Sequence, residues 1–91
     1  MSLSKNDIKF LKSLQQKKFR DLEGLFIVEG EKLTEEILSS DFDIEGIYHT
    51  AGFKVPLEVR GIEISQKELE RISGLKTPNK VLVVGKKKAS H

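Results

Sequence analysis

The stretch of residues 25–38 constrains the fold of this chain most strongly. Its first four residues are apolar, three of them β-branched or aromatic, as is typical of a buried strand, and they lead into the pair Glu29-Gly30. Glycine permits a sharp turn at this point because it has no Cβ. Apolar side chains then recur at helical spacing, at Leu33, Ile37 and Leu38. The stretch therefore predicts a strand that leads directly into a helix packed against a sheet.

The rest of the chain supplies further strands and helices. Two pairs match the spacing of a capping box and predict helix starts, Ser4 with Asp7 and Ser65 with Glu68. Strands are predicted over residues 44–50, 57–64 and 81–84, whereas Pro56 argues against a regular element in the link before residue 57. The continuous apolar run of residues 81–84 is typical of a central strand covered on both faces. This order of elements predicts an α/β fold, a small three-layer α/β/α sandwich with a mixed sheet.

Composition excludes several classes of function. The 91 residues suffice for one domain, and the lack of cysteine excludes disulfides, thiolate nucleophiles and thiolate metal sites. No apolar run approaches the roughly 20 residues of a membrane span, and the start lacks the apolar core of a signal peptide, so we expect a cytoplasmic protein with no membrane partner. With two histidines and no phosphate-binding glycine motif, we expect no catalytic residue, no cofactor and no metal site in this chain.

Charge is distributed unevenly along the chain. Residues 1–20 carry six basic side chains against one acid, residues 21–75 carry a net charge of −8, and residues 76–91 carry five lysines and no acid. The basic side chains of the first part lie on one stripe of a helix that begins at Lys5 and on its continuation: Lys5, Lys9, Lys12, Lys17, Lys18 and Arg20. The opposite side of this helix is apolar, with Phe10, Leu11 and Leu14. Such a surface predicts binding to a polyphosphate partner.

Several partners stay open for this basic surface. Lysine and arginine bind phosphates with little base specificity, and an aromatic content of five Phe and one Tyr does not favour a base-stacking platform. Recognition of folded RNA by its shape is therefore favoured over reading of a DNA groove. DNA or an acidic protein would also bind such a helix, and many lysine faces are simply solvated. The lysines of residues 86–91 suit either a phosphate contact or a disordered, solubilising end.

A combination of motifs resembles a known family. It comprises Ser4-Lys5-Asn6, Lys17-Lys18 with Arg20, Phe26-Ile27-Val28-Glu29-Gly30, and Ile72-Ser73-Gly74-Leu75-Lys76-Thr77-Pro78 before a strand. Over about residues 4–84, the pattern resembles the amino-terminal substrate-binding domain of the SpoU (TrmH-like) RNA 2′-O-ribose methyltransferases. The resemblance implies a fold similar to that of kink-turn-binding ribosomal proteins.

The resemblance also implies a partner, structured ribosomal or transfer RNA. The implied RNA-binding residues are Lys5, Asn6, Lys9, Lys12, Lys17, Lys18, Arg20, Glu29, Gly30, Lys32, Lys76 and Thr77. Purely structural roles stand beside some of these, since Gly30 suits a turn and Glu29 a helix end. The same holds for Pro78, which suits a helix stop.

Family enzymes continue into a catalytic domain that binds S-adenosylmethionine, and no motif of that domain occurs in this sequence. We therefore expect a monomeric RNA-recognition module with a basic helix over residues 1–22, an α/β domain over 23–85 and a disordered basic tail over 86–91. The link at residues 51–57 is short for the helix expected there, which predicts weaker cover of that side of the sheet. The alternatives are a stand-alone kink-turn-type RNA-binding or ribosome-associated protein and a protein-interaction domain.

Overall fold

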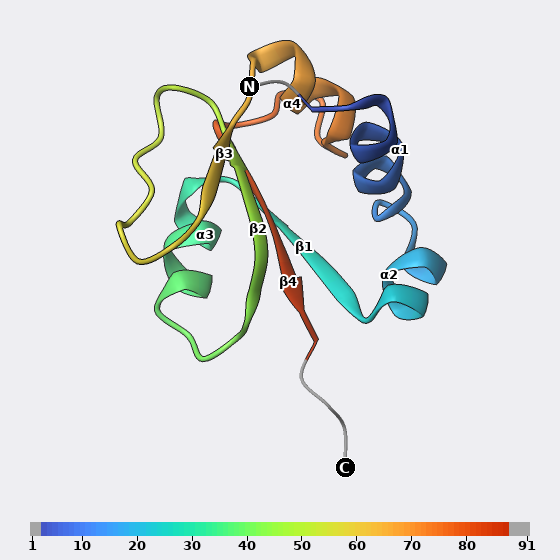
Figure 1. Cartoon of the computed structure of the whole chain (residues 1–91), viewed down its shortest axis with the longest axis horizontal. Coiled ribbons are helices and arrows are strands. Elements are labelled where there is room, and N and C mark those ends of the chain that lie inside the picture. Colours follow the sequence, from blue (N-terminus) through green and yellow to red (C-terminus); the bar gives the residue numbers. More distant parts are fainter. Residues whose placement is uncertain (1–2, 88–91) are drawn as a thin grey trace.

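The chain folds around a four-stranded mixed sheet flanked by helices in the computed structural model, which describes residues 3–87 (Figure 1). In chain order the elements are α1 (Lys5–Ser13), α2 (Lys17–Glu23), β1 (Leu25–Glu29), α3 (Glu31–Leu38), β2 (Ile44–His49), β3 (Gly61–Glu63), α4 (Gln66–Ile72) and β4 (Val81–Lys86). Both predicted capping boxes are present, at the starts of α1 and α4. The two predicted helix starts are therefore confirmed.

Strand β4 lies inside the sheet, whose order is β1-β4-β2-β3. It is antiparallel to both neighbours, while β3 pairs in parallel with β2 at the edge. The side chains of Val81–Val84 are at most 1% exposed, because both faces of this strand are covered. The prediction of a central strand at this run is confirmed.

Helices cover both faces of the sheet. On one face, Leu11 of α1 and Leu69 of α4 join the core that contains Leu82. On the other face, Ile37 of α3 and Phe53 of the loop over residues 50–60 pack in the core that contains Val83. Figure 1 shows α1 and α4 on one side of the strands and α3 on the other. The predicted α/β/α sandwich with a mixed sheet is confirmed.

The basic helix predicted at the start of the chain is two helices, so the prediction of one continuous helix is wrong. Leu14 is fully buried at the end of α1, and Gln16 then takes extended backbone angles (φ −98°, ψ 129°) before α2 begins. The predicted apolar face also changes, because Ile8 is buried whereas Phe10 is 41% exposed. The break lets Leu14 enter the core and gives α2 a new direction.

The predicted buried face of α3 is also wrong, because the helix is rotated relative to the prediction. Leu33 is 53% exposed, whereas Thr34 is fully buried, and Ile37 and Leu38 are partly buried against the core. Thr34 lies one turn before Leu38 on the same face of the helix, whereas Leu33 lies on its flank. A threonine hydroxyl thus takes a place where the spacing of apolar residues predicted a leucine.

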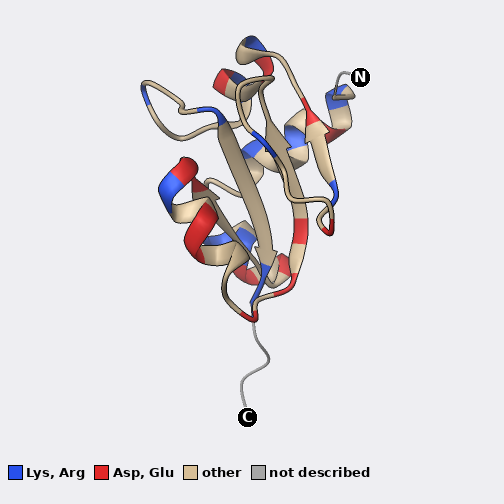
Figure 2. Ribbon diagram, turned by 90° about the vertical axis from the view of Figure 1, so that its left-hand side faces the viewer, with Lys and Arg blue, Asp and Glu red and all other residues tan. Residues whose placement is uncertain are grey.

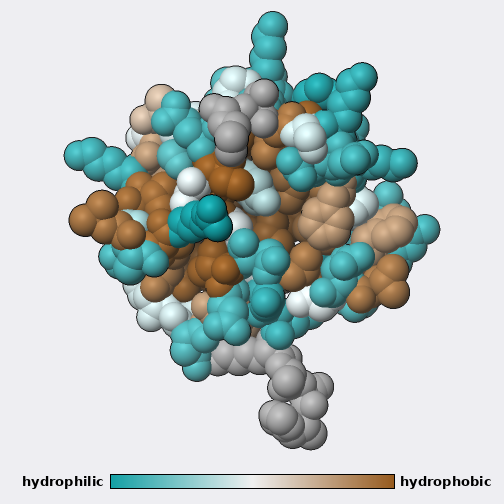
Figure 3. Space-filling model, viewed as in Figure 1, coloured by the Kyte–Doolittle hydropathy of each residue, from teal (hydrophilic) through white to brown (hydrophobic). Residues whose placement is uncertain are grey.

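The predicted strand over residues 57–64 is confined to β3. The N–H of Val59 donates to the carbonyl of Pro56 (3.0 Å), so the chain turns there, and Leu57 is completely exposed. No helix forms over residues 50–60, but Phe53, Val55 and Val59 pack against the sheet and cover its face. On the face that Figure 3 shows, brown apolar side chains lie over this loop and the β3 edge, interrupted by teal polar ones.

The ends of the chain differ from the predicted segments. The boundary predicted between residues 22 and 23 falls within α2, and α1 contributes to the core. Lys86 of the predicted tail belongs to β4, and Lys87 follows it directly. Residues 88–91 lie outside the described part of the chain.

Candidate nucleic-acid interface

The predicted basic stripe on α1 is present and points away from the core. Lys5, Lys9 and Lys12 are exposed on the side of α1 opposite Leu11, and the predicted site residue Asn6 is exposed beside them. Within residues 3–87, none of the three lysines forms an ion pair with a carboxylate. Their charge is therefore available to an external anion.

The start of α1 is fixed against α4. The backbone N–H of Leu3 donates to Glu68 Oε2 (2.7 Å), while Glu68 Oε1 accepts the N–H of Ser65 (3.0 Å) at the cap of α4. These donors, first Ser65 and then Leu3, lower the pKa of Glu68. The stripe therefore sits on a helix that is held both by its core residues and at its first turn.

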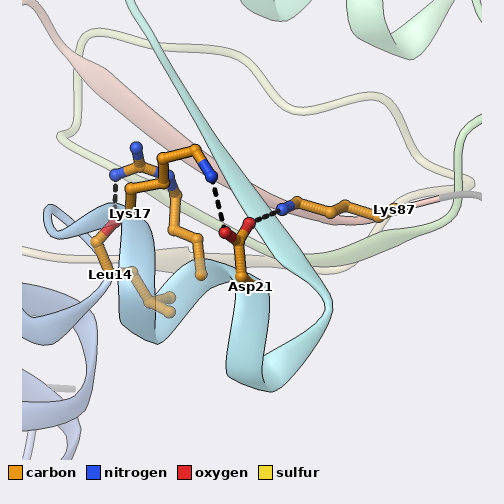
Figure 4. Close-up of polar contacts among 5 residues, drawn as sticks. Leu14, Lys17, Asp21 and Lys87 are labelled. Carbon is orange, nitrogen blue, oxygen red and sulfur yellow. Dashed lines mark hydrogen bonds and ion pairs between the residues drawn. The ribbon is translucent and has the colours of Figure 1, made fainter.

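The predicted site residues on α2 differ from those on α1, because one of them, Lys17, forms an ion pair with Asp21. Its carboxylate lies 2.7 Å from Lys17 Nζ and 2.5 Å from Lys87 Nζ (Figure 4). Hydrogen bonds from Lys17 and then Lys87 lower the pKa of Asp21 from 3.8 to about 2. Lys17 is thus partly neutralised by a neighbouring acid, which the sequence interpretation did not include.

The other two basic residues of α2 also make contacts within the chain. Arg20 Nη1 donates to the carbonyl of Leu14 (2.8 Å), so the guanidinium fastens the break between α1 and α2. Lys18 Nζ lies 5.0 Å from the ring centroid of Phe19, the geometry of a cation–π contact. Arg20 therefore stabilises the turn between the two helices, whereas the side chain of Lys18 stays exposed to solvent.

Glu29 and Gly30 hold neighbouring segments together. The Glu29 carboxylate accepts the Ser73 hydroxyl and the Gly74 N–H (3.0 Å). Gly30 has φ 98°, which favours glycine, and its N–H donates to the carbonyl of Val81 (3.0 Å). The structure therefore gives both residues contacts within the domain.

Lys32 lies in acidic surroundings. It belongs to α3, which also carries Glu31, Glu35 and Glu36, and Figure 2 shows the acidic ribbon of this helix on the side turned to the viewer. Glu31 pairs with Lys80 (3.4 Å). A phosphate would meet a weaker positive field at Lys32 than at the stripe on α1.

Lys76 and Thr77 occupy the segment between α4 and β4, where both side chains are exposed. This segment begins beside the end of α1, because Gln15 Nε2 donates to the carbonyl of Ile72 (2.8 Å). The structure thus joins this segment to α1, whereas Lys32 lies on α3, across the sheet (Figure 1). The sequence interpretation missed Gln15, for which it offers no signal, and Asp21, which the (i, i+4) spacing from Lys17 indicates.

Other chemistry has little support in the described residues. Within residues 3–87, no group of three or more His, Asp or Glu side chains is placed to hold a metal ion. None of the helices in this part of the chain is long and apolar enough to cross a membrane. A depression at the β3 edge is lined by Glu45, Arg60, Gly61, Ile62 and Glu63, none of them predicted site residues.

Several proteins of known structure are similar to this chain. A solved protein assigned to the TrmH family of RNA methyltransferases, from Porphyromonas gingivalis, is 34% identical, with a TM-score of 0.78 over 92% of this chain and 35% of its own. An AdoMet-bound rRNA methyltransferase from Sinorhizobium meliloti is 22% identical, with a TM-score of 0.74 over 99% of this chain and 38% of its own. The SpoU methyltransferase AviRb from Streptomyces viridochromogenes is 14% identical, with a TM-score of 0.73 over 96% and 37%. The latter two show the fold alone.

The family itself follows from the sequence match. Comparison with curated protein sequences found no match. The chain spans 35 to 38% of the length of the three solved relatives. The model of the MRM3-like substrate-binding domain matches residues 5–83, which is most of the chain. The predicted resemblance is confirmed, and the chain belongs to the MRM3-like substrate-binding domains of TrmH (SpoU) RNA methyltransferases.

Proposed function

We propose that this domain binds structured ribosomal or transfer RNA for a 2′-O-ribose methyltransferase whose catalytic domain lies outside these residues. Membership in a substrate-binding family supports the proposal, as does the short span of the chain relative to its solved relatives. The observation that carries RNA binding is the stripe of Lys5, Lys9 and Lys12, which have no carboxylate partner in the described chain. A cytoplasmic monomer is our expectation for the domain.

The stripe suits phosphates for a physical reason. Lysines at positions i, i+4 and i+7 of one helix project from the same side, so they can neutralise several phosphates along one backbone. Contacts of this kind fix the position of an RNA without reading its bases. The role of the domain is then to hold an RNA fold while another domain modifies it.

The methyl donor S-adenosylmethionine is proposed to bind outside this chain. A small-molecule site encloses most of its ligand in a mainly apolar cleft. The depression at the β3 edge is open to solvent and is lined by only five residues, Glu45, Arg60, Gly61, Ile62 and Glu63, so it does not enclose a ligand of this size. No step of methyl transfer is assigned to residues of this chain.

Titration with RNA at several salt concentrations tests the proposal. We expect the chain to bind transfer RNA, or a ribosomal RNA stem with an internal loop, with an affinity that falls steeply as salt rises. The double variant Lys5→Glu/Lys9→Glu should bind more weakly and lower the slope of log K against log salt by about 1.4 to 1.8, since each of the two lost phosphate contacts contributes about 0.7 to 0.9. Its thermal midpoint should change little because the side chains are exposed.

A matched control changes the same charge elsewhere. Lys54→Glu/Arg60→Glu alters two exposed residues of the loop over residues 50–60, which lies on the other face of the sheet. We expect a much smaller effect on RNA binding. An equal loss of RNA affinity in both variants would mean that net charge alone drives binding. The α1 lysines would then be excluded as a specific RNA-binding surface. A wild-type chain without salt-dependent RNA affinity would favour the protein-interaction alternative.

A further inference from the structure

Residues 73–80, between α4 and β4, form a segment with exposed residues between two anchored ends. Lys76 and Thr77 are exposed, and within residues 3–87 neither side chain forms a hydrogen bond or an ion pair. Pro78 next to them is buried. A short stretch thus stays open to solvent although the backbone around it is fixed.

Glu29 holds the first end of this segment. One carboxylate oxygen accepts the hydroxyl of Ser73, and the other accepts the N–H of Gly74 (3.0 Å). The same hydroxyl oxygen accepts the N–H of Leu75 (2.9 Å). Glu29, at the end of β1, therefore holds Ser73 and Gly74, and Ser73 in turn holds Leu75 immediately before Lys76.

Gln15 holds the same end from the side of α1. Its Nε2 donates to the carbonyl of Ile72 (2.8 Å), and its Oε1 lies so close to Gly74 that a Cβ at this position would collide with it. A side chain at residue 74 would therefore displace the Gln15 amide. The turn that follows α1 is therefore in contact with the start of the segment over residues 73–80.

The far end of the segment is held by other contacts. The carbonyl of Lys80 accepts the N–H of Thr50 (2.8 Å), and Lys80 Nζ pairs with Glu31 (3.4 Å). Lys80 has φ 60°, the left-handed region that a non-glycine residue rarely adopts. The surrounding contacts therefore hold the backbone in an unusual conformation directly before β4.

We propose that Glu29 and Gln15 are positioning residues, which hold Lys76 and Thr77 in place to contact RNA phosphates together with the lysines of α1. The inference rests on the proposed function. A segment that is ordered in advance loses less conformational freedom when it binds. The inference replaces the predicted direct contact of Glu29 with RNA, because both of its oxygens already accept hydrogen bonds and its charge repels a phosphate.

The variant Glu29→Gln tests the inference, because it keeps the shape of the side chain but leaves a single acceptor oxygen for two donors, the Ser73 hydroxyl and the Gly74 N–H. We expect RNA affinity to fall about three- to tenfold, the size that ordering one or two side chains on binding would give. The loss should occur although the variant removes a negative charge. Amide exchange at Gly74 and Leu75 should become faster.

A double-mutant cycle separates positioning from a general structural role. In a Lys76→Ala/Thr77→Ala background, Glu29→Gln should have no further effect on RNA affinity, because the groups that it positions are gone. Gln15→Ala should likewise weaken RNA binding in the wild-type background and have no further effect in the Lys76→Ala/Thr77→Ala background. The matched controls are Glu35→Gln and Gln66→Ala, which change exposed side chains of α3 and α4 and should not weaken binding.

The outcomes distinguish this inference from the proposed function. If wild type binds RNA but Glu29→Gln binds equally well, only the inference is wrong. An equal loss from Glu29→Gln in both backgrounds would also overturn it, since the effect would not pass through Lys76 and Thr77. If wild type shows no salt-dependent RNA affinity, the proposed function fails and the inference fails with it.

Discussion

Helices α1 and α2 follow each other in sequence and carry the same kind of basic side chains, yet the fold uses them in opposite ways. Ile8 and Leu11 of α1 are buried, and Leu14 follows them into the core, whereas α2 has no buried residue. The lysines of α1 have no carboxylate partner in the described chain, whereas Lys17 of α2 pairs with Asp21.

The difference shows why the lysines of α1, but not all the basic residues of α2, lack partners within the described chain. A helix that is anchored by apolar burial can leave its polar face without contacts inside the protein. Helix α2 has no fully buried residue, and its polar side chains make contacts within the chain instead, Asp21 with Lys87 and Arg20 with the carbonyl of Leu14. Positive residues on α1 are therefore better placed to bind an external anion than those on α2.

The largest expected effect tests the anchoring. Leu11→Ala should lower the free energy of unfolding by about 2–5 kcal/mol, because the side chain is only 1% exposed and its removal leaves a cavity. Leu22→Ala on α2, where leucine is 76% exposed, should change it by less than about 0.5 kcal/mol. Urea unfolding measures both. Similar losses in the two variants would remove the contrast between the helices.

The next effect concerns RNA binding. Lys9→Gln should lower the slope of log K against log salt by about one, whereas Lys17→Gln should lower it by less, because Lys17 already interacts with Asp21. Titration of both variants against the same RNA measures the difference. The opposite order would make α2 the principal binding surface.

The sequence predicted the layers of the fold better than its details. Binary patterns and capping boxes found the central strand and the starts of α1 and α4, because these depend on neighbouring residues in the chain. The exposure of Leu33 in place of Thr34 depends on how α3 rotates against the sheet. Tertiary packing decides such a rotation, and spacing alone does not.

The candidate site likewise contains features that the sequence predicts and features that it does not. The α1 lysines were predictable because three residues on one helix stripe share a direction whatever the tertiary structure. The pairing of Asp21 with Lys87 joins residues 66 positions apart, and the contact of Glu29 with Ser73 spans 44. Contacts between distant residues require the sheet order, so the role of Glu29 and the pairing of Asp21 with Lys87 could not be predicted, whereas the (i, i+4) pairing of Asp21 with Lys17 could.

A smaller effect is expected from Asp21→Asn, which weakens the hold on Lys17 and Lys87. Both lysines would then be free to meet phosphates, so RNA affinity at low salt should rise about two- to fivefold, with a steeper dependence on salt. Asp43→Asn is a control that removes the same charge from another exposed acid. If both variants gain equally, the effect comes from net charge, and the pairing at Asp21 would not restrain the lysines of α2.

The smallest effect is a dependence of stability on pH. The pKa of Asp21 is about 2 in the folded chain and near 3.8 when unpaired, so its ion pairs favour the folded state fully above pH 4 and lose this effect as the pH falls toward 2. The thermal midpoint of wild type should therefore exceed that of Asp21→Asn at pH 5, and the difference should shrink toward zero at pH 2. Glu68 also titrates in acid, but it is present in both proteins and cancels in the comparison. A difference that stays constant from pH 5 to pH 2 would show that the carboxylate of Asp21 does not hold α2 through its charge.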